Sequence, residues 1–122
     1  MENLRRNLST VEDVKKVEFR PLRLAFSTTG EQISPGSSGA QLLFEFKRLR
    51  EATVRKTAAS LGLKTESTGR QVLVFDRRRI FTLQVTPGLA RPTRMIVVGG
   101  DKYGRLPGEA QETILSFLRG FK

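Results

Sequence analysis

Residues 47–79, KRLREATVRKTAASLGLKTESTGRQVLVFDRRR, carry the pattern on which the predicted fold depends. Leu49–Leu61 predicts a basic amphipathic helix, and Gly62 is the residue expected to end it in a left-handed conformation. Two short β-rich runs follow, the second of them Gln71–Asp76, and an arginine triplet closes the stretch. Apolar anchors among so many cations are typical of a small domain that binds an anion.

The chain after this stretch predicts two more strands and a closing helix. Ile80–Thr86 alternates apolar and polar side chains, and Thr93–Val98 continues the same antiparallel meander. The helix is expected to begin at Pro107, because proline is favoured in the first turn. Its apolar stripe comprises Ala110, Ile114, Phe117, Leu118 and Phe121.

The chain before the stretch gives weaker signals. Ser9-Thr10-Val11-Glu12 fits a capping box, which predicts a short helix from Ser9 to about Val17. Pro21 marks the start or the edge position of a strand in which Leu22, Leu24 and Phe26 alternate with other residues. Residues 28–39, TTGEQISPGSSG, are predicted as a loop. Gln41–Arg48 fits a strand and equally the beginning of the long helix.

Taken together, these elements predict one α+β domain over residues 19–122, with residues 1–18 as an N-terminal lead-in that includes at most a short helix. The fold class is a curved antiparallel sheet of four to five strands with two helices packed on one face. A chain of 122 residues is long enough for a small hydrophobic core of this kind.

Composition removes several classes of site. The chain contains no cysteine and no histidine, which excludes a disulfide framework, a thiolate metal site and the commonest general base. No apolar run approaches about 18 residues, and the N-terminal sequence is too polar for a signal peptide. We expect no metal and no cofactor, and a cytoplasmic protein peripheral to a membrane, with the nucleus as the alternative.

The carboxylates do not form a pattern suited to catalysis. Glu45, Glu51, Asp76 and Asp101 are scattered over different predicted elements. The glycine-rich segment 97–104, VVGGDKYG, lacks the spacing of a phosphate-binding loop. We therefore expect a protein that is not an enzyme.

Charge is the strongest global signal, because 22 Lys and Arg against 12 Asp and Glu give a net charge of +10. Arginine favours bidentate contact with phosphate or carboxylate groups. Adjacent like charges repel one another, so three arginines in one turn are unfavourable unless they contact an anion. The triplet is therefore a candidate contact surface, and a solvated hairpin tip is the alternative. The candidate anion-binding residues are Lys47, Arg48, Arg50, Arg55, Lys56, Arg77, Arg78, Arg79, Arg91 and Arg94.

The order of elements and several short phrases resemble kinase-associated domain 1, the C-terminal module of microtubule-affinity-regulating, AMP-activated-related and septin-ring kinases. The similar segments are Arg23–Thr29, Val54–Leu63, Gln71–Asp76, Ile80–Val85 and Met95–Phe121. The loop at Gly30–Gly39 departs from the family pattern. The resemblance implies binding of acidic phospholipids such as phosphatidylserine through the basic residues, and in some members an autoinhibitory contact with a kinase domain.

A second resemblance is to the Arg-x-x-x-His family, which binds single-stranded nucleic acid. It rests on Leu61-Gly62-Leu63, Glu66-Ser67 and Val72-Leu73-Val74. However, Glu51 stands where the family has its signature arginine and Arg55 where it has its histidine, so both signature residues are absent. Aromatic residues suited to base stacking are few, and Tyr103 is the only tyrosine. A nucleic-acid-binding domain and a module that docks an acidic protein partner are therefore the alternatives.

Overall fold

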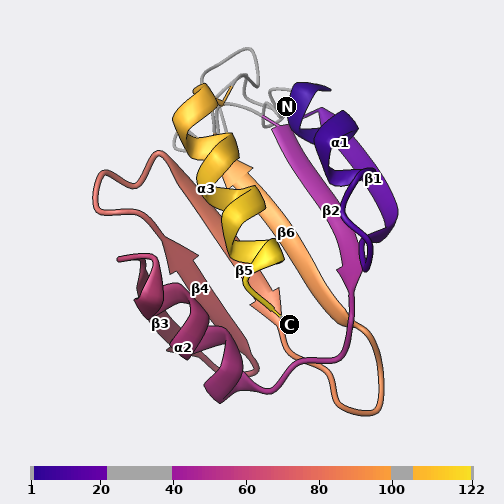
Figure 1. Cartoon of the computed structure of the whole chain (residues 1–122). Helices are drawn as coiled ribbons and strands as arrows, with labels where there is room; N and C mark the ends of the chain where they lie inside the picture. The colour runs from indigo at the N-terminus through magenta and orange to yellow at the C-terminus, as the bar shows by residue number, and fades with distance from the viewer. Residues whose placement is uncertain (1, 22–39, 100–105, 122) are drawn as a thin grey trace, which may run out of the picture.

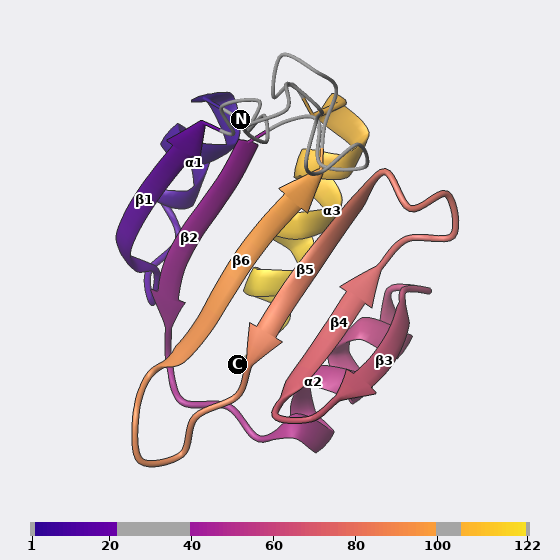
Figure 2. The same cartoon turned by 180° about the vertical axis from the view of Figure 1, so that it is seen from behind.

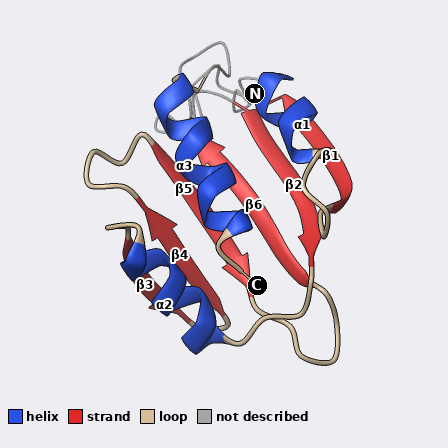
Figure 3. Ribbon diagram, in the orientation of Figure 1, coloured by secondary structure: helices blue, strands red, loops and turns tan. Residues whose placement is uncertain are grey.

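The computed structural model describes residues 2–21, 40–99 and 106–121, which contain three helices and six strands (Figures 1 and 3). The elements are α1 (Glu2–Leu8), β1 (Lys15–Pro21), β2 (Ala40–Phe46), α2 (Glu51–Ser60), β3 (Lys64–Thr68), β4 (Gln71–Phe75), β5 (Phe81–Thr86), β6 (Thr93–Gly99) and α3 (Gly108–Arg119). The predicted α+β class is confirmed, with one strand more than the four to five expected; the third helix, α1, lies in the N-terminal lead-in, where a short helix was allowed.

All six described strands belong to one antiparallel sheet in the order β1-β2-β6-β5-β4-β3. The last of the six described strands, β6, lies between β2 and β5, so Ile96 is the register partner of both Leu43 and Gln84. The three helices cover one face of the sheet (Figure 1), and the opposite face carries no helix in the described part of the chain (Figure 2). The predicted packing of the helices on one face is thus confirmed.

Burial with a period of two decides the open question of Gln41–Arg48 in favour of a strand. Leu42, Phe44 and Phe46 are at most 3% exposed, and Leu43 and Glu45 between them are only partly buried. This alternation places every second side chain of β2 under the helices. Phe44, which does not fit the helical face, is accommodated because the segment is not a helix.

Helix α2 begins at Glu51, two residues later than predicted. Arg50 is the N-cap residue and has an extended conformation, with φ −87° and ψ 150°. The predicted end is confirmed, because Gly62 has φ +72° and its N–H bonds to the Ala59 carbonyl at 3.0 Å. As a consequence, residues 47–50 form a linker and not a first helical turn.

The capping-box prediction near the N-terminus is wrong. Helix α1 ends at Leu8, and the Ser9 hydroxyl donates to the Arg5 carbonyl at 3.2 Å, which places Ser9 after a helix and not before one. Leu4 and Leu8 are fully buried in the main core cluster. The N-terminal segment is therefore part of the fold, and the boundary drawn after residue 18 falls within β1.

Strand β1 forms an edge of the sheet. Pro21 pairs with Ala40 at the end of β1, which agrees with the predicted edge position and not with a strand start. The predicted strand around Leu22, Leu24 and Phe26, the loop of residues 28–39, Asp101 and Tyr103 lie outside the described residues.

Helix α3 crosses the middle of the sheet and closes the core. Its predicted apolar stripe is buried, and Leu115 adds to it. The Phe117 and Phe121 rings meet edge to face with centroids 4.9 Å apart, and Phe121 contacts Phe46 at 5.8 Å. This cluster ties the C-terminal residues to the end of β2, beside the linker to α2.

Candidate anion-binding surface

The predicted cations fall into three groups in space. Arg77–Arg79 occupy the β4–β5 turn at one end of the sheet, and Arg55 and Lys56 lie on α2. Lys47, Arg48, Arg50, Arg91 and Arg94 lie at the other end, in the β2–α2 linker, the β5–β6 loop and the first residues of β6. The two ends are separated by the length of β5, roughly 17 Å at the usual strand rise.

The Lys47 side chain is engaged in contacts within the domain. Its Nζ donates to the Phe121 carbonyl at 2.6 Å, lies 3.7 Å from a carboxylate oxygen of Asp13, and is 5.7 Å from the Phe46 ring centroid. These contacts join the end of β2 to the C-terminal residues. The structure therefore gives Lys47 a role in holding the fold together.

Arg55 is also engaged, on the outer face of α2. Its guanidinium donates to the Ser67 hydroxyl and to the Glu51 carboxylate, and Ser67 in turn donates to Glu51 at 2.6 Å. The hydrogen bond from Ser67, followed by the hydrogen bond and charge of Arg55, lowers the pKa of Glu51 below 4.5. Lys56, one residue further on, is exposed.

The arginine triplet forms the exposed tip of a tight turn, as predicted. The Asp76 side chain accepts a hydrogen bond from the Ile80 N–H at 2.8 Å, and Arg79 adopts φ +52°. The Arg79 guanidinium lies 4.6 Å from the Phe75 ring centroid. Arg79 is thereby used in a cation–π contact, whereas Arg77 and Arg78 project into solvent.

The opposite end of the sheet gathers a second set of arginines because three connections meet there. The register places Phe46 opposite Thr93, Thr86 opposite Arg94, and Thr68 opposite Gln71. The linker 47–50, the loop 87–92 and the turn at residues 69–70 therefore emerge at the same end of the sheet. We call the exposed arginines of these connections and of the adjoining β6 the arginine end; they are Arg48, Arg50, Arg70, Arg91 and Arg94.

Within the described residues, the side chains of the arginine end form no hydrogen bond and no ion pair. Glu45 is the register partner of Arg94 on β2, but its carboxylate is 3.6 Å from Lys16. Glu51, which lies at the rim, is held by Ser67 and Arg55. The positive charge at this end is consequently available to a partner from outside the described residues.

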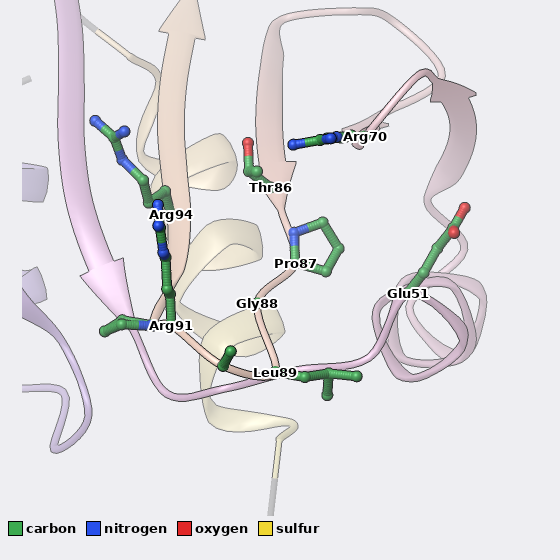
Figure 4. A pocket seen from close by; sticks show the side chains of 10 residues that line it. Glu51, Arg70, Thr86, Pro87, Gly88, Leu89, Arg91 and Arg94 are labelled. Carbon is green, nitrogen blue, oxygen red and sulfur yellow. The ribbon is translucent and has the colours of Figure 1, made fainter.

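A groove of about 620 Å³ lies within the arginine end (Figure 4). Arg70 extends from the β3–β4 turn toward Thr86 on one side, and Arg91 and Arg94 lie on the other side along β6. Arg70 was not among the predicted residues. Its position directly after Gly69, in a turn that follows a strand, was the signal that could have indicated an exposed cation beside the Pro87–Pro92 loop.

A second groove, of about 560 Å³, lies on the other side of the β5–β6 loop. Arg48, Arg50 and Thr53 line it together with Leu89, which also lines the first groove. Leu89 therefore stands on the ridge between two grooves that are both lined by arginines. Its side chain is 63% exposed, and the only other large hydrophobic residue exposed in the described ranges is Leu61, at 41%.

Within residues 2–21, 40–99 and 106–121, no group of three or more acidic side chains could hold a metal ion. No helix in these ranges is long and apolar enough to cross a membrane. The sequence matches no family model, and it matches neither a curated protein nor a solved structure.

Proposed function

We propose that this chain is a non-catalytic module that binds acidic phospholipids at a membrane surface through the arginine end. The observation that carries the proposal is the gathering of exposed arginines without partners, in the described part of the chain, at one end of the sheet. A basic side chain close to an anionic bilayer contributes about 1 kcal/mol, and arginine can contact a phosphate through two N–H groups. Several such residues at one end give the domain one preferred orientation on the membrane.

Two further observations support a lipid surface over the alternatives. The exposed large hydrophobic residues of the described ranges are leucines, so these ranges offer no exposed aromatic platform for stacking bases. From β2 onward, the element order is strand, helix, four strands and helix. This is the order on which the resemblance to kinase-associated domain 1 rests, although the strand before the helix is Ala40–Phe46, and Arg23–Thr29 lies outside the described residues.

The test is co-sedimentation with vesicles of phosphatidylcholine alone and of phosphatidylcholine with phosphatidylserine, at low and physiological salt. One variant combines Arg70→Ala, Arg91→Ala and Arg94→Ala. The control combines Lys56→Ala, Arg77→Ala and Arg78→Ala, whose side chains are exposed and form no polar contact with other described residues. Each variant has a net charge of 10 − 3 = +7, so the pair separates the position of the charge from its amount.

We expect salt-sensitive binding to the phosphatidylserine vesicles alone. The first variant should lose about 100-fold in affinity, the equivalent of about 1 kcal/mol for each arginine, and the control should lose less than about fivefold. Equal losses in both variants would show that net charge acts without a defined surface. Failure to bind vesicles, with tight retention of a single-stranded oligonucleotide, would overturn the proposal and favour nucleic-acid binding.

A further inference from the structure

The β5–β6 loop presents an apolar tip within a highly basic surface. Residues 86–92 read TPGLARP, a segment without an acidic residue, and Leu89 at its centre is 63% exposed. Ala90 and Pro92 beside it are also exposed. A leucine exposed to this extent gives little to the stability of the isolated domain, since burial of its side chain is what would stabilise it.

The base of this loop is held in a fixed conformation. The Thr93 hydroxyl, which is 0% exposed, accepts hydrogen bonds from the backbone N–H of Leu49 at 3.0 Å and of Gly88 at 3.3 Å. The Leu49 N–H also lies 3.0 Å from the Gly88 carbonyl. Pro87 and Pro92 restrict the backbone further. A loop fixed in this way loses little conformational entropy when its tip enters another phase.

The surroundings of Leu89 match the layers of a membrane surface. The grooves on its two sides are lined by Arg70, Arg91 and Arg94 on one side and by Arg48 and Arg50 on the other. Lipid phosphates that approach these arginines would surround the leucine, and the acyl chains lie immediately below the phosphates. An apolar residue that projects between cations suits such an interface, because the arginines face the lipid phosphates and the leucine faces the acyl chains.

We infer that Leu89 inserts between the acyl chains of an acidic bilayer when the arginine end binds the lipid phosphates. This inference rests on the proposed function and specifies its geometry: the β5–β6 loop enters the membrane, and the β4–β5 turn with Arg77 and Arg78 points away from it. Insertion supplies a part of the affinity that salt does not screen, in contrast to the arginines.

The chain contains no tryptophan, so a single introduced indole reports its own environment. The experiment uses the full chain with Leu89→Trp, and with Leu61→Trp as the matched control at the other exposed leucine. With vesicles of phosphatidylcholine and phosphatidylserine, the indole at position 89 should shift its emission to the blue and be quenched by lipids brominated on their acyl chains. The indole at position 61 should show neither effect.

Affinity provides the second measurement. Leu89→Ala should weaken vesicle binding about tenfold and Leu61→Ala less than twofold, and the difference should persist at physiological salt. If the chain binds the vesicles but the indole at position 89 remains unquenched, insertion is overturned while the proposed function stands. If the chain does not bind acidic vesicles at all, both are overturned.

Discussion

The hydroxyl of Thr93 and the backbone N–H of Leu49 form a buried hydrogen bond of 3.0 Å between segments that are 44 residues apart. Thr93 is the one buried polar residue in the described part of the chain, and its hydroxyl also accepts from the Gly88 N–H. One side chain thus joins the β2–α2 linker to the β5–β6 loop. These are two of the three connections that carry the arginine end.

Replacing this hydroxyl should lower the stability of the fold. Thr93→Val keeps the shape of the side chain but leaves the Gly88 N–H without its acceptor, so we expect a loss of about 1–3 kcal/mol in the free energy of unfolding. Thr93→Ser retains the acceptor and should lose less. Urea denaturation measures both variants, provided that the dependence of the unfolding free energy on urea concentration has the same slope as in the parent chain. A Thr93→Val variant as stable as the parent chain would show that the hydroxyl does not hold the loop.

A side chain at Gly88 should distort the same loop. A Cβ at this position would lie 2.2 Å from the Arg91 carbonyl oxygen and 2.9 Å from that of Pro92, and both are backbone atoms that cannot move independently. We therefore expect Gly88→Ala to cost about 1–3 kcal/mol, in the range of overpacking and strain. The control is Gly108→Ala, at the start of α3, where a Cβ meets nothing within 4 Å. Thermal unfolding should find this control neutral or slightly stabilised.

Lys47 is expected to contribute to stability and not to anion binding. Lys47→Met removes the hydrogen bond to the Phe121 carbonyl and the ion pair with Asp13, which should cost about 1–2 kcal/mol. Lys56→Met removes the same charge from an exposed position on α2 and should change stability by less than about 0.5 kcal/mol. Denaturant midpoints compare the two. Equal midpoints would mean that the contacts of Lys47 contribute nothing.

Glu51 should make the fold sensitive to acid. Its pKa is lowered by the hydrogen bond from Ser67 first and by Arg55 second. A carboxyl group whose folded-state pKa is depressed stabilises the fold above its unfolded-state value, and this contribution disappears as the pH falls through the folded-state pKa. The relevant window therefore lies below about pH 4.5.

Nuclear magnetic resonance titration of the Glu51 carboxyl carbon tests this prediction. Ser67→Ala removes the first cause and should raise the pKa of Glu51 toward 4.5. Thr68→Ala, on the same strand but without a side-chain hydrogen bond among the described residues, is the control and should leave the pKa of Glu51 in place. A pKa that responds equally to both substitutions would contradict the assigned cause.

The parts of the fold that followed from the sequence are those with a local physical signal. Alternation predicted β5, and Gly62 correctly marked the end of α2. The N-terminal prediction failed because a Ser-x-x-Glu pattern is satisfied by chance in a polar segment, whereas α1 is stabilised by burial of Leu4 and Leu8 against distant residues. Tertiary packing decides such short helices, and no window of sequence contains that information.

The composition of the candidate surface was predicted better than its location. The sequence indicates many exposed arginines, but which of them share one end depends on the register of strands far apart in the chain. Arg70 and Arg94 meet across one groove only because β4, β5 and β6 are paired in the observed order. Lys47 and Arg79 were expected to bind anions, yet both make specific contacts inside the molecule, with Phe121 and Phe75 respectively.

The central position of β6 has a consequence for how the chain folds during its synthesis. The segments α1-β1-β2 and α2-β3-β4-β5 pair with each other only through β6, which follows the other five described strands in the chain. Until residues 93–99 emerge, each half presents an unpaired strand edge, β2 in the first and β5 in the second. Both edges are sites of misassembly in a nascent chain, and long-range pairing of this kind slows folding. The sheet is therefore complete only when residues 93–99 pair with both β2 and β5.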